Sequence, residues 1–319
     1  MMLRGSLPSH SCDLECEAPH STGLKGPAFS VPAGACDCHM HLFDTKAPFA
    51  PGPVLTHGDA TVDHYRELQR RLHIERCVLV QPSSYGRDNR VLLRGLRALG
   101  NSARGVAVID PSATPTELQV LHAAGVVGVR FNLVQAGATS EQMLEDVARL
   151  IHPFGWHVQL HAHPADLMSL ADRLTALPVP VVIDHFARIN VEPAMSDRVR
   201  NLLLRMLGSG NVWMKMSAPY IASPDSKAYE DLDDLVRHLA GERLDRLVWG
   251  TDWPHVTESS KPDDAVLINL LARWLSEDEI HVVLVENAAR LYHFTSDGGG
   301  PAMPRWPGNY SRSVKTIDM

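Results

Sequence analysis

The sequence has few cysteines, no long apolar run and no excess of basic residues. Its 319 residues include five cysteines, an odd number, so we expect no disulfide framework and a reducing cytoplasm as the compartment. No run of about 18 apolar residues occurs, and the first residues lack the apolar stretch of a secretory signal, so we expect neither a membrane span nor export. A net charge of -7 provides no basic surface for a phosphate backbone, which argues against a nucleic-acid partner.

Short apolar runs alternate with amphipathic segments from residue 34 onward. Hydrophobic residues make up 45% of the chain, which suffices for a large core. The runs start roughly 20 to 40 residues apart, as expected for parallel strands joined by helices. We expect strands at 35–39, 77–81, 105–110, 126–131, 157–161, 180–184, 212–216 and 247–250. We expect helices at 63–72, 89–99, 115–123, 140–151, 165–176, 197–207, 229–240, 263–275 and 277–292.

Eight strand and helix units on about 260 residues predict an α/β fold of the (β/α)8 barrel type, a TIM barrel. A doubly wound open sheet is the alternative, but no Gly-x-Gly-x-x-Gly motif follows any of the strands. We expect a single catalytic domain at 31–295. Residues 1–30, rich in Ser, Pro, Gly and His, are predicted to form a flexible leader or surface arm, and 296–319 a C-terminal tail.

Polar residues gather where the predicted strands end, which is where (β/α)8 barrels perform chemistry. His39 and His41 close the first strand and, two residues apart, point to the same face. Asp252 directly follows the last strand. Singly, each has a structural explanation, such as an exposed loop histidine or a turn cap, but together they predict an active site. The other strand-end residues of this kind are Ser83, Ser84, Tyr85, Arg130, Asn132, His161, His163, Asp184, His185, Lys215 and Ser217.

Several segments resemble a known family. They are His39-Met40-His41, Asp184-His185, Trp249-Gly250-Thr251-Asp252-Trp253-Pro254-His255 and Glu286-Asn287-Ala288-Ala289-Arg290-Leu291-Tyr292. Together they are similar to the amidohydrolase-related barrels of amidohydrolase family 2, over about residues 33 to 294. The segments 80–86 and 128–132 look like the group that contains 2-pyrone-4,6-dicarboxylate lactonase and sugar-acid lactonases.

The resemblance implies a hydrolase that opens a small carboxylated lactone from aromatic or sugar-acid catabolism. Ester hydrolysis needs a base for water and a group that receives charge on the carbonyl oxygen. Asp252 would be the base, and His39, His41 and His185 would polarise the carbonyl or hold a cation. Arg130 would pair with a substrate carboxylate, because its planar fork suits a bidentate contact. The remaining expected pocket residues are Ser83, Ser84, Tyr85, Asn132, Lys215 and Trp253.

The resemblance leaves metal use open, because the dicarboxylate lactonase works without a divalent metal and many related barrels bind one. The implied ligands of one divalent cation, zinc or manganese, are His39, His41, His161 and Asp252. His163 competes with His161, since both lie on one face of the fifth strand. We expect a bound cation, with a metal-independent site as the alternative.

Missing charges bear on the substrate. No second arginine occurs in 132–137 or 217–223, which favours a substrate with one carboxylate or none unless Arg87, Arg90 or Arg188 contributes. Other functions remain open: a zinc-dependent non-oxidative decarboxylase of an aromatic acid, a lactone isomerase, and a binding barrel without catalysis. The sequence does not determine the oligomeric state, and a homo-oligomer is one of the alternatives.

Overall fold

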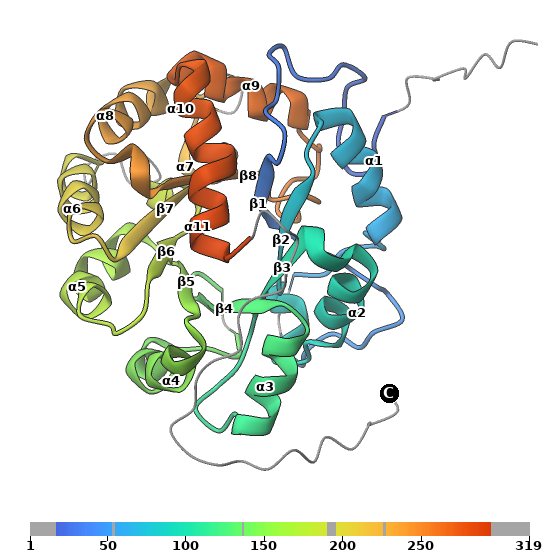
Figure 1. Ribbon diagram of the computed structural model, residues 1–319, viewed down its shortest axis with the longest axis vertical. Helices are drawn as coiled ribbons and strands as arrows, with labels where there is room; N and C mark the ends of the chain where they lie inside the picture. The colour runs from blue at the N-terminus through green and yellow to red at the C-terminus, as the bar shows by residue number, and fades with distance from the viewer. Residues whose placement is uncertain (1–16, 53–54, 136, 190–195, 226–227, 295–319) are drawn as a thin grey trace, which may run out of the picture.

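Eight parallel strands form a barrel in the computed structural model, which describes residues 17–52, 55–135, 137–189, 196–225 and 228–294 (Figure 1). Each strand pairs with the next in sequence order. The ring closes where the end of β1 meets the segment that follows β8. There the Asp252 N–H donates to the His39 carbonyl at 2.8 Å, and the His41 N–H donates to the Trp253 carbonyl at 2.8 Å. The strands are β1 Cys36–Met40, β2 Arg76–Val80, β3 Ala103–Ala107, β4 Val126–Asn132, β5 His157–His161, β6 Val181–Ile183, β7 Val212–Ser217 and β8 Leu247–Gly250.

Helices surround the strands, as the alternating pattern predicts, and the predicted (β/α)8 barrel is confirmed. The α-helices are α1 Val62–Leu72, α2 Arg90–Leu99, α3 Pro115–Ala123, α4 Leu144–Ile151, α5 Pro164–Thr175, α6 Ser196–Gly208, α7 Pro219–Ala222, α8 Asp233–Arg243, α9 Asp264–Trp274, α10 Glu277–His281 and α11 Ala288–Tyr292. A π-helical segment, η9 Val282–Asn287, joins the last two. The 3-10 turns are η1 Ser83–Tyr85, η2 Gly100–Ser102, η3 Glu141–Met143, η4 His152–Phe154, η5 His185–Arg188, η7 Glu230–Leu232 and η8 Leu244–Arg246.

The third strand begins two residues before its predicted start. Residue 104 is an arginine, a residue type that is rarely fully buried, yet Arg104 is only 2% exposed. Its guanidinium donates to the carbonyls of Asn101 at 3.1 Å and His293 at 3.2 Å, and it lies over the ring of Phe294. The buried charge is therefore satisfied by carbonyls and an aromatic face at the N-terminal end of the barrel.

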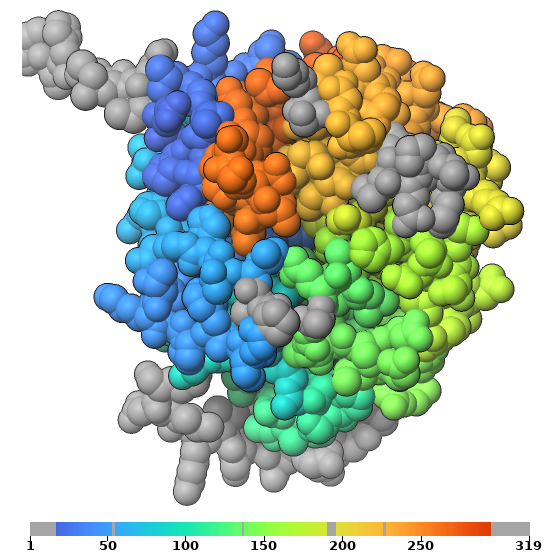
Figure 2. All heavy atoms as spheres, turned by 180° about the vertical axis from the view of Figure 1, so that it is seen from behind, coloured from blue at the N-terminus to red at the C-terminus, as the bar shows by residue number. Residues whose placement is uncertain are grey.

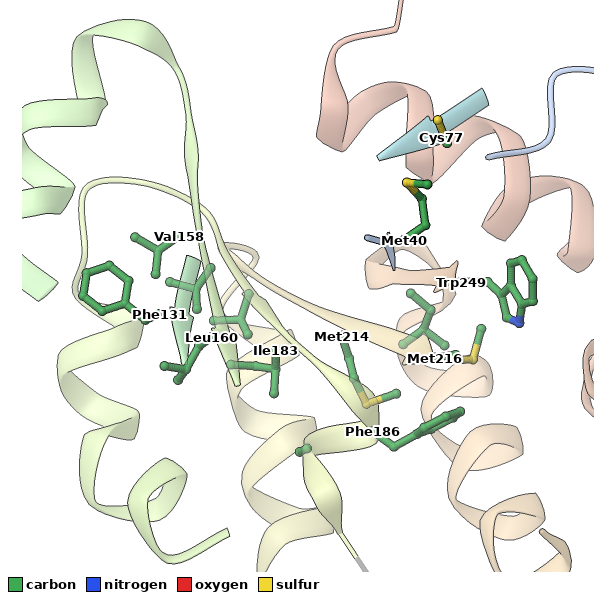
Figure 3. Close-up of a cluster of buried hydrophobic side chains, with 14 of the residues drawn as sticks. Met40, Cys77, Phe131, Val158, Leu160, Ile183, Phe186, Met214, Met216 and Trp249 are labelled. Carbon is green, nitrogen blue, oxygen red and sulfur yellow. The ribbon is translucent and has the colours of Figure 1, made fainter. Parts of the chain in front are cut away.

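The hydrophobic core lies between the strands and the surrounding helices. Figure 3 shows part of it, with Phe131, Leu160, Ile183, Met214 and Met216 from neighbouring strands packed side by side. A second, smaller cluster contains alternate residues of the strands, such as Cys36, Cys38, Val78 and Val80, together with α11. This helix lies across one end of the barrel (Figure 1), so the opposite end is left for a site.

The described part of the N-terminal segment, residues 17–30, packs against the barrel as a surface arm. The Trp253 indole N–H donates to the Pro19 carbonyl at 2.8 Å, and the Asp264 backbone N–H donates to Ser21 Oγ at 3.2 Å. Arg71 on α1 donates to Ser21 Oγ at 3.1 Å and to the Thr22 carbonyl at 3.0 Å. The arm therefore fastens the segment after β8 to α1. Residues 1–16 and the predicted tail lie outside the described residues, and the domain boundaries stay a prediction.

None of the helices in the described ranges is long and apolar enough to cross a membrane. Within the same ranges, Cys36, Cys38 and Cys77 are buried free thiols, whereas Cys12 and Cys16 lie outside them. The expected reducing compartment stays a prediction.

The end of β8 has no room for a side chain at Gly250. A Cβ there would lie 2.6 Å from the backbone nitrogen of His39 and 2.8 Å from its Cβ. We expect Gly250→Ala to lower the free energy of unfolding by about 1–3 kcal/mol, because β1 and β8 must separate to admit the methyl group. Urea unfolding measures this effect. The matched control is Gly241→Ala on α8, where a Cβ meets nothing within 4 Å and should stabilise the helix by up to about 1 kcal/mol. Equal stability of the two variants would contradict the close approach of β8 to β1 at Gly250.

Candidate active site

An irregularity in β1 directs His39 into the barrel. The register between β1 and β2 shifts between Asp37 and Met40, so β1 carries one extra residue there. Cys38 belongs to the second, smaller cluster, which contains alternate strand residues and α11. Met40 belongs to the hydrophobic core between the strands and the surrounding helices. The bulge lets His39 join Cys38 on the inner side, and His41 follows two residues later. Both histidines are thereby placed at the end of the barrel opposite α11.

Asp252 meets these histidines across the seam of the barrel. Its Oδ1 lies 3.5 Å from His39 Nε2, 3.4 Å from His41 Nε2 and 4.0 Å from His185 Nε2. The backbone at Asp252 has φ of 68°, and all four residues of η5, which begins with His185, also have positive φ. Such left-handed backbone is costly for residues other than glycine and is often found at functional sites. The structure thus brings together the four residues expected to be catalytic.

The contacts of His41 leave its Nε2 without a proton when the ring is neutral. Its Nδ1 lies 2.7 Å from the Val80 carbonyl, so Nδ1 carries the proton and donates it to that oxygen. The Nε2 lone pair then faces the Asp252 carboxylate at 3.4 Å. A positive charge between the two groups resolves this repulsion, either as a second proton on His41 or as a bound cation.

The same atoms satisfy the geometric requirements of a metal site. The separations of 3.4 and 3.5 Å exceed the hydrogen-bond range of about 2.7–3.2 Å and match the edge of a tetrahedron whose ligands lie about 2.1 Å from zinc. His39 Nε2 is buried and has no hydrogen-bond partner. Among the described residues, His39, His41 and Asp252 form a group whose ligand atoms all lie within 4.8 Å of one another. The residues present therefore fit a divalent cation.

A buried ion pair lies beneath His39. Lys215 Nζ on β7 is 2.9 Å from Gln159 Oε1, 3.2 Å from Asp184 Oδ1 and 3.2 Å from His39 Nδ1, and both Lys215 and Asp184 are fully or almost fully buried. His39 Nδ1 is also 3.4 Å from Asp184 Oδ1. His39 thus has two tautomers: with an Nδ1–H that faces Asp184 Oδ1 at 3.4 Å, Nε2 is free as a ligand, and with Nδ1 accepting from Lys215, Nε2–H becomes a donor.

The charges in the cluster follow from burial and contacts. Burial by itself raises the pKa of Asp252, but interactions with His185, His41 and His39 outweigh it and hold that pKa well below its ordinary value. Burial lowers the pKa of His39 well below its usual range, with Lys215 adding to the effect, and burial also lowers the pKa of His185. The carboxylate is therefore ionised at neutral pH, while His39 and His185 are neutral.

A pocket opens above the cluster at the C-terminal end of the strands. Its cavity volume is about 50 Å³. Figure 2 shows this face, where the blue segment after β1, the green segment after β4 and the orange segment after β8 come together. Polar lining residues include Ser83, Ser84, Arg130, Asn132, His161 and His185, and apolar ones include Phe43, Leu55, Ile221 and Val256.

The family model described as amidohydrolase matches residues 36–294 of this chain. The chain belongs to the amidohydrolase family. It is 37% identical over 281 residues to a 2-pyrone-4,6-dicarboxylate hydrolase of Comamonas testosteroni, covering 83% of this chain and 92% of the relative. It is 31% identical to a 4-sulfomuconolactone hydrolase of Rhizobium radiobacter, over 87% of this chain and 95% of the relative. It is also 33% identical to a D-galactarolactone isomerase of Agrobacterium fabrum, over 83% and 92%.

A solved structure supports the same relationship. The apo crystal structure of an Agrobacterium tumefaciens protein superposes with a TM-score of 0.80 at 30% identity, covering 86% of this chain and 99% of that one. The resemblance expected from the motifs is confirmed, and the chain is an amidohydrolase-family enzyme whose relatives act on lactones.

Three residues expected in the pocket of this amidohydrolase lie elsewhere. Trp253 is fully buried beside Tyr65 and His20 on the arm, because the left-handed backbone at Asp252 turns the next side chain away. The Tyr85 hydroxyl bonds to the backbone of Asp44, outside the pocket lining. Lys215 lies beneath the histidines.

The fifth-strand histidines also differ in their placement. His161 lines the pocket but lies outside the cluster of His39, His41 and Asp252. Its ring faces that of His185 at 4.8 Å between centroids, and its Nε2 is 3.4 Å from Arg188. His163 precedes α5 as its N-cap residue. After His39 and His41, the histidine with a ring nitrogen near Asp252 Oδ1 is His185, at 4.0 Å.

Sequence reasoning missed two groups of polar residues in this amidohydrolase. Gln159 on β5 donates to Asp184 Oδ2 at 2.9 Å and supports the ion pair. Tyr220 on α7 donates to Asp252 Oδ2 at 2.9 Å and contacts His255. His255 was visible within the Asp-Trp-Pro-His motif, but nothing in the sequence connects Tyr220 to it, because they lie in segments after different strands.

Proposed function

We propose that this amidohydrolase opens the lactone ring of a small carboxylated substrate from aromatic or sugar-acid catabolism. The observation that carries the proposal is the ionised Asp252 carboxylate, which lines the same pocket as the buried guanidinium of Arg130. Relatives that hydrolyse 2-pyrone-4,6-dicarboxylate and 4-sulfomuconolactone support a ring ester with an anionic substituent.

The residues suit a general-base hydrolysis. Asp252 Oδ1 takes a proton from water, and the resulting hydroxide adds to the lactone carbonyl carbon. The Nε2–H of His39, present when its Nδ1 accepts from Lys215, would stabilise the negative charge on the carbonyl oxygen. When the ring C–O bond breaks, the proton held by Asp252 passes to the departing ring oxygen, so the products are a carboxylic acid and a hydroxyl group on one open chain.

We further propose that His39, His41 and Asp252 hold one divalent cation, zinc or manganese, with His185 as the nearest further histidine. Such a cation polarises a carbonyl and lowers the pKa of bound water. Support comes from the 3.4 Å separation of His41 Nε2 and Asp252 Oδ1 and from the unpartnered Nε2 of His39.

Metal analysis tests this assignment. In untagged protein we expect about one equivalent of divalent metal per chain, because the three ligand atoms converge on one point. His39→Ala and His41→Ala should lose most of it, as measured by inductively coupled plasma mass spectrometry. His163→Ala, outside the cluster, is the matched control and should retain it. A protein that is metal-free and fully active would disprove the metal site.

The arginines bear on substrate charge. Arg130 donates to the Gln81 carbonyl at 3.0 Å, and its Nε is buried without a partner. Arg87 and Arg90 are exposed and paired with Asp110 and Asp88. Arg188, in contrast, is partly buried next to His161, with its own Nε unpartnered. Arg188 thus lies beside His161, which lines the pocket together with Arg130, and a second anionic group on the substrate is compatible with the site.

Arg130→Met should raise KM by about 10- to 100-fold with a smaller change in kcat, because it removes a charge-assisted contact to the substrate carboxylate. Steady-state kinetics on the lactone that the enzyme opens would show it. Arg149→Met on α4, an exposed arginine paired with Asp146, is the control and should leave KM unchanged. A selective loss of kcat would instead place Arg130 at the reacting carbonyl.

Proton release at constant pH tests the function itself. The panel contains 2-pyrone-4,6-dicarboxylate, monocarboxylated muconolactones and sugar-acid lactones. Acid release with ring opening supports the lactonase. A new lactone seen by NMR without acid release would indicate an isomerase, which the 33% identity to D-galactarolactone isomerase makes the second candidate. Release of carbon dioxide would indicate a decarboxylase.

A further inference from the structure

A chain of buried polar groups leads away from Asp252 on the side opposite the histidines. The Tyr220 hydroxyl lies 2.9 Å from Asp252 Oδ2 and 2.9 Å from His255 Nδ1, and His255 Nε2 lies 3.0 Å from Asp264 Oδ2. Both His255 and Asp264 are fully buried. None of these three residues lines the pocket, so the chemistry described above does not use them.

The directions of these hydrogen bonds follow from counting protons. A carboxylate only accepts hydrogen bonds, so the single hydroxyl proton of Tyr220 must point to Asp252. His255 Nδ1 must then carry a proton and donate it to the Tyr220 oxygen. His255 Nε2 faces Asp264 Oδ2 at 3.0 Å, and this contact fixes the orientation of the imidazole ring.

The pair is fixed in place by its surroundings. The Asp264 backbone N–H donates to Ser21 Oγ on the arm at 3.2 Å, and Lys261 Nζ donates to the His255 carbonyl at 2.7 Å. The His255 N–H donates to the Asp252 carbonyl at 2.9 Å. His255 consequently presents its Nδ1 to Tyr220 from a rigid position.

We propose that Tyr220 is a positioning residue for Asp252, and that the buried pair of His255 and Asp264 fixes the direction of its hydrogen bond. Tyr220 engages Oδ2 and holds the plane of the carboxylate, which leaves Oδ1, the oxygen near His39, His41 and His185, as the one that reacts. This inference rests on the proposed role of Asp252 as the base.

Kinetics of single and double variants test the proposal on the lactone that the panel identifies, beginning with 2-pyrone-4,6-dicarboxylate. Tyr220→Phe should lower kcat by roughly 10- to 100-fold, because a hydrogen bond to a charged group is lost, while KM changes little. His255→Gln, which places its amide near the former Nε2 and loses the donor to Tyr220, should have a similar effect. His255→Asn, with an amide near the former Nδ1, should recover most of kcat.

The double variant separates positioning from a structural role. If His255 acts through the Tyr220 hydroxyl, Tyr220→Phe with His255→Gln should be no slower than Tyr220→Phe alone. Additive losses, or equal losses in His255→Asn and His255→Gln, would overturn the proposal.

A neutron structure of the deuterated wild-type protein gives an answer that does not depend on activity or on variants that fold. We expect deuterons on His255 Nδ1 and on the Tyr220 oxygen in the direction of Asp252. A hydroxyl deuteron directed at His255 Nδ1 would overturn the proposal. If the wild-type protein opens no lactone, the proposed function fails, and the neutron structure still decides the direction of the hydrogen bond.

Discussion

Asp252→Asn is expected to lower kcat by roughly 10³- to 10⁴-fold while KM changes by less than about threefold, the result for loss of a general base. Asparagine has nearly the same shape, and its one amide oxygen, in the position of Asp252 Oδ2, can still accept from Tyr220. It cannot take a proton from water, and its amide has no charge to balance a cation or a protonated His41. The lost step is therefore chemical, and substrate binding through Arg130 should persist.

Proton release on the best lactone of the panel measures this loss, with circular dichroism to confirm the fold. Asp172→Asn on α5 is the matched control, because Asp172 is exposed and its side chain lies outside the pocket lining. It should leave kcat unchanged. Activity in Asp252→Asn within about tenfold of the wild type would assign the base to another group.

Lys215→Met is expected to lower the free energy of unfolding by about 3–5 kcal/mol, because it leaves the Asp184 carboxylate buried without its ammonium partner. Both side chains are fully inaccessible to solvent. Asp184→Asn should cost a similar amount, since it leaves Lys215 unpaired. The double variant with both substitutions should recover much of the loss, because no uncompensated charge remains. Additive losses in the double variant would show that the two charges do not interact.

The pH dependence of stability gives an independent check. Burial by itself raises the pKa of Asp184, but Lys215 first and His39 next outweigh it and hold that pKa well below its ordinary value. The folded-state pKa thus lies below the unfolded value near about 3.9. The contribution of the ion pair is present above that value and is lost as the pH falls toward the folded pKa. Chemical unfolding at a series of acidic pH values should show the wild type losing more stability than the double variant as the pH falls.

Much of the fold follows from the sequence because each strand and helix has its own local pattern. All eight strands were predicted within about two or three residues, since parallel barrel strands are buried on both faces and appear as short apolar runs. Arg104 shows where this logic stops: a charged residue looks like a strand boundary unless its partners, the carbonyls of Asn101 and His293, are known.

The gathering of side chains was predictable where it depends on a strand end and not where it depends on backbone direction. His39, His41, His185 and Asp252 were predicted to meet because they end or follow strands, and the structure places them together. Trp253 was expected in the pocket because it follows Asp252, but the positive φ of Asp252 turns it toward the arm. Tyr220 was missed because its partners, Asp252 and His255, lie after a different strand.

The contact between β1 and β8 also determines when the barrel can close during synthesis of the chain. Asp37 accepts hydrogen bonds from the backbone and hydroxyl of Thr251, which is 214 positions away in the chain. A growing chain that has not yet produced β8 leaves one edge of β1 unpaired, and such an edge invites association with other strands. His39 and His41 emerge early and Asp252 late, so this cluster can assemble only once nearly the whole barrel has been made.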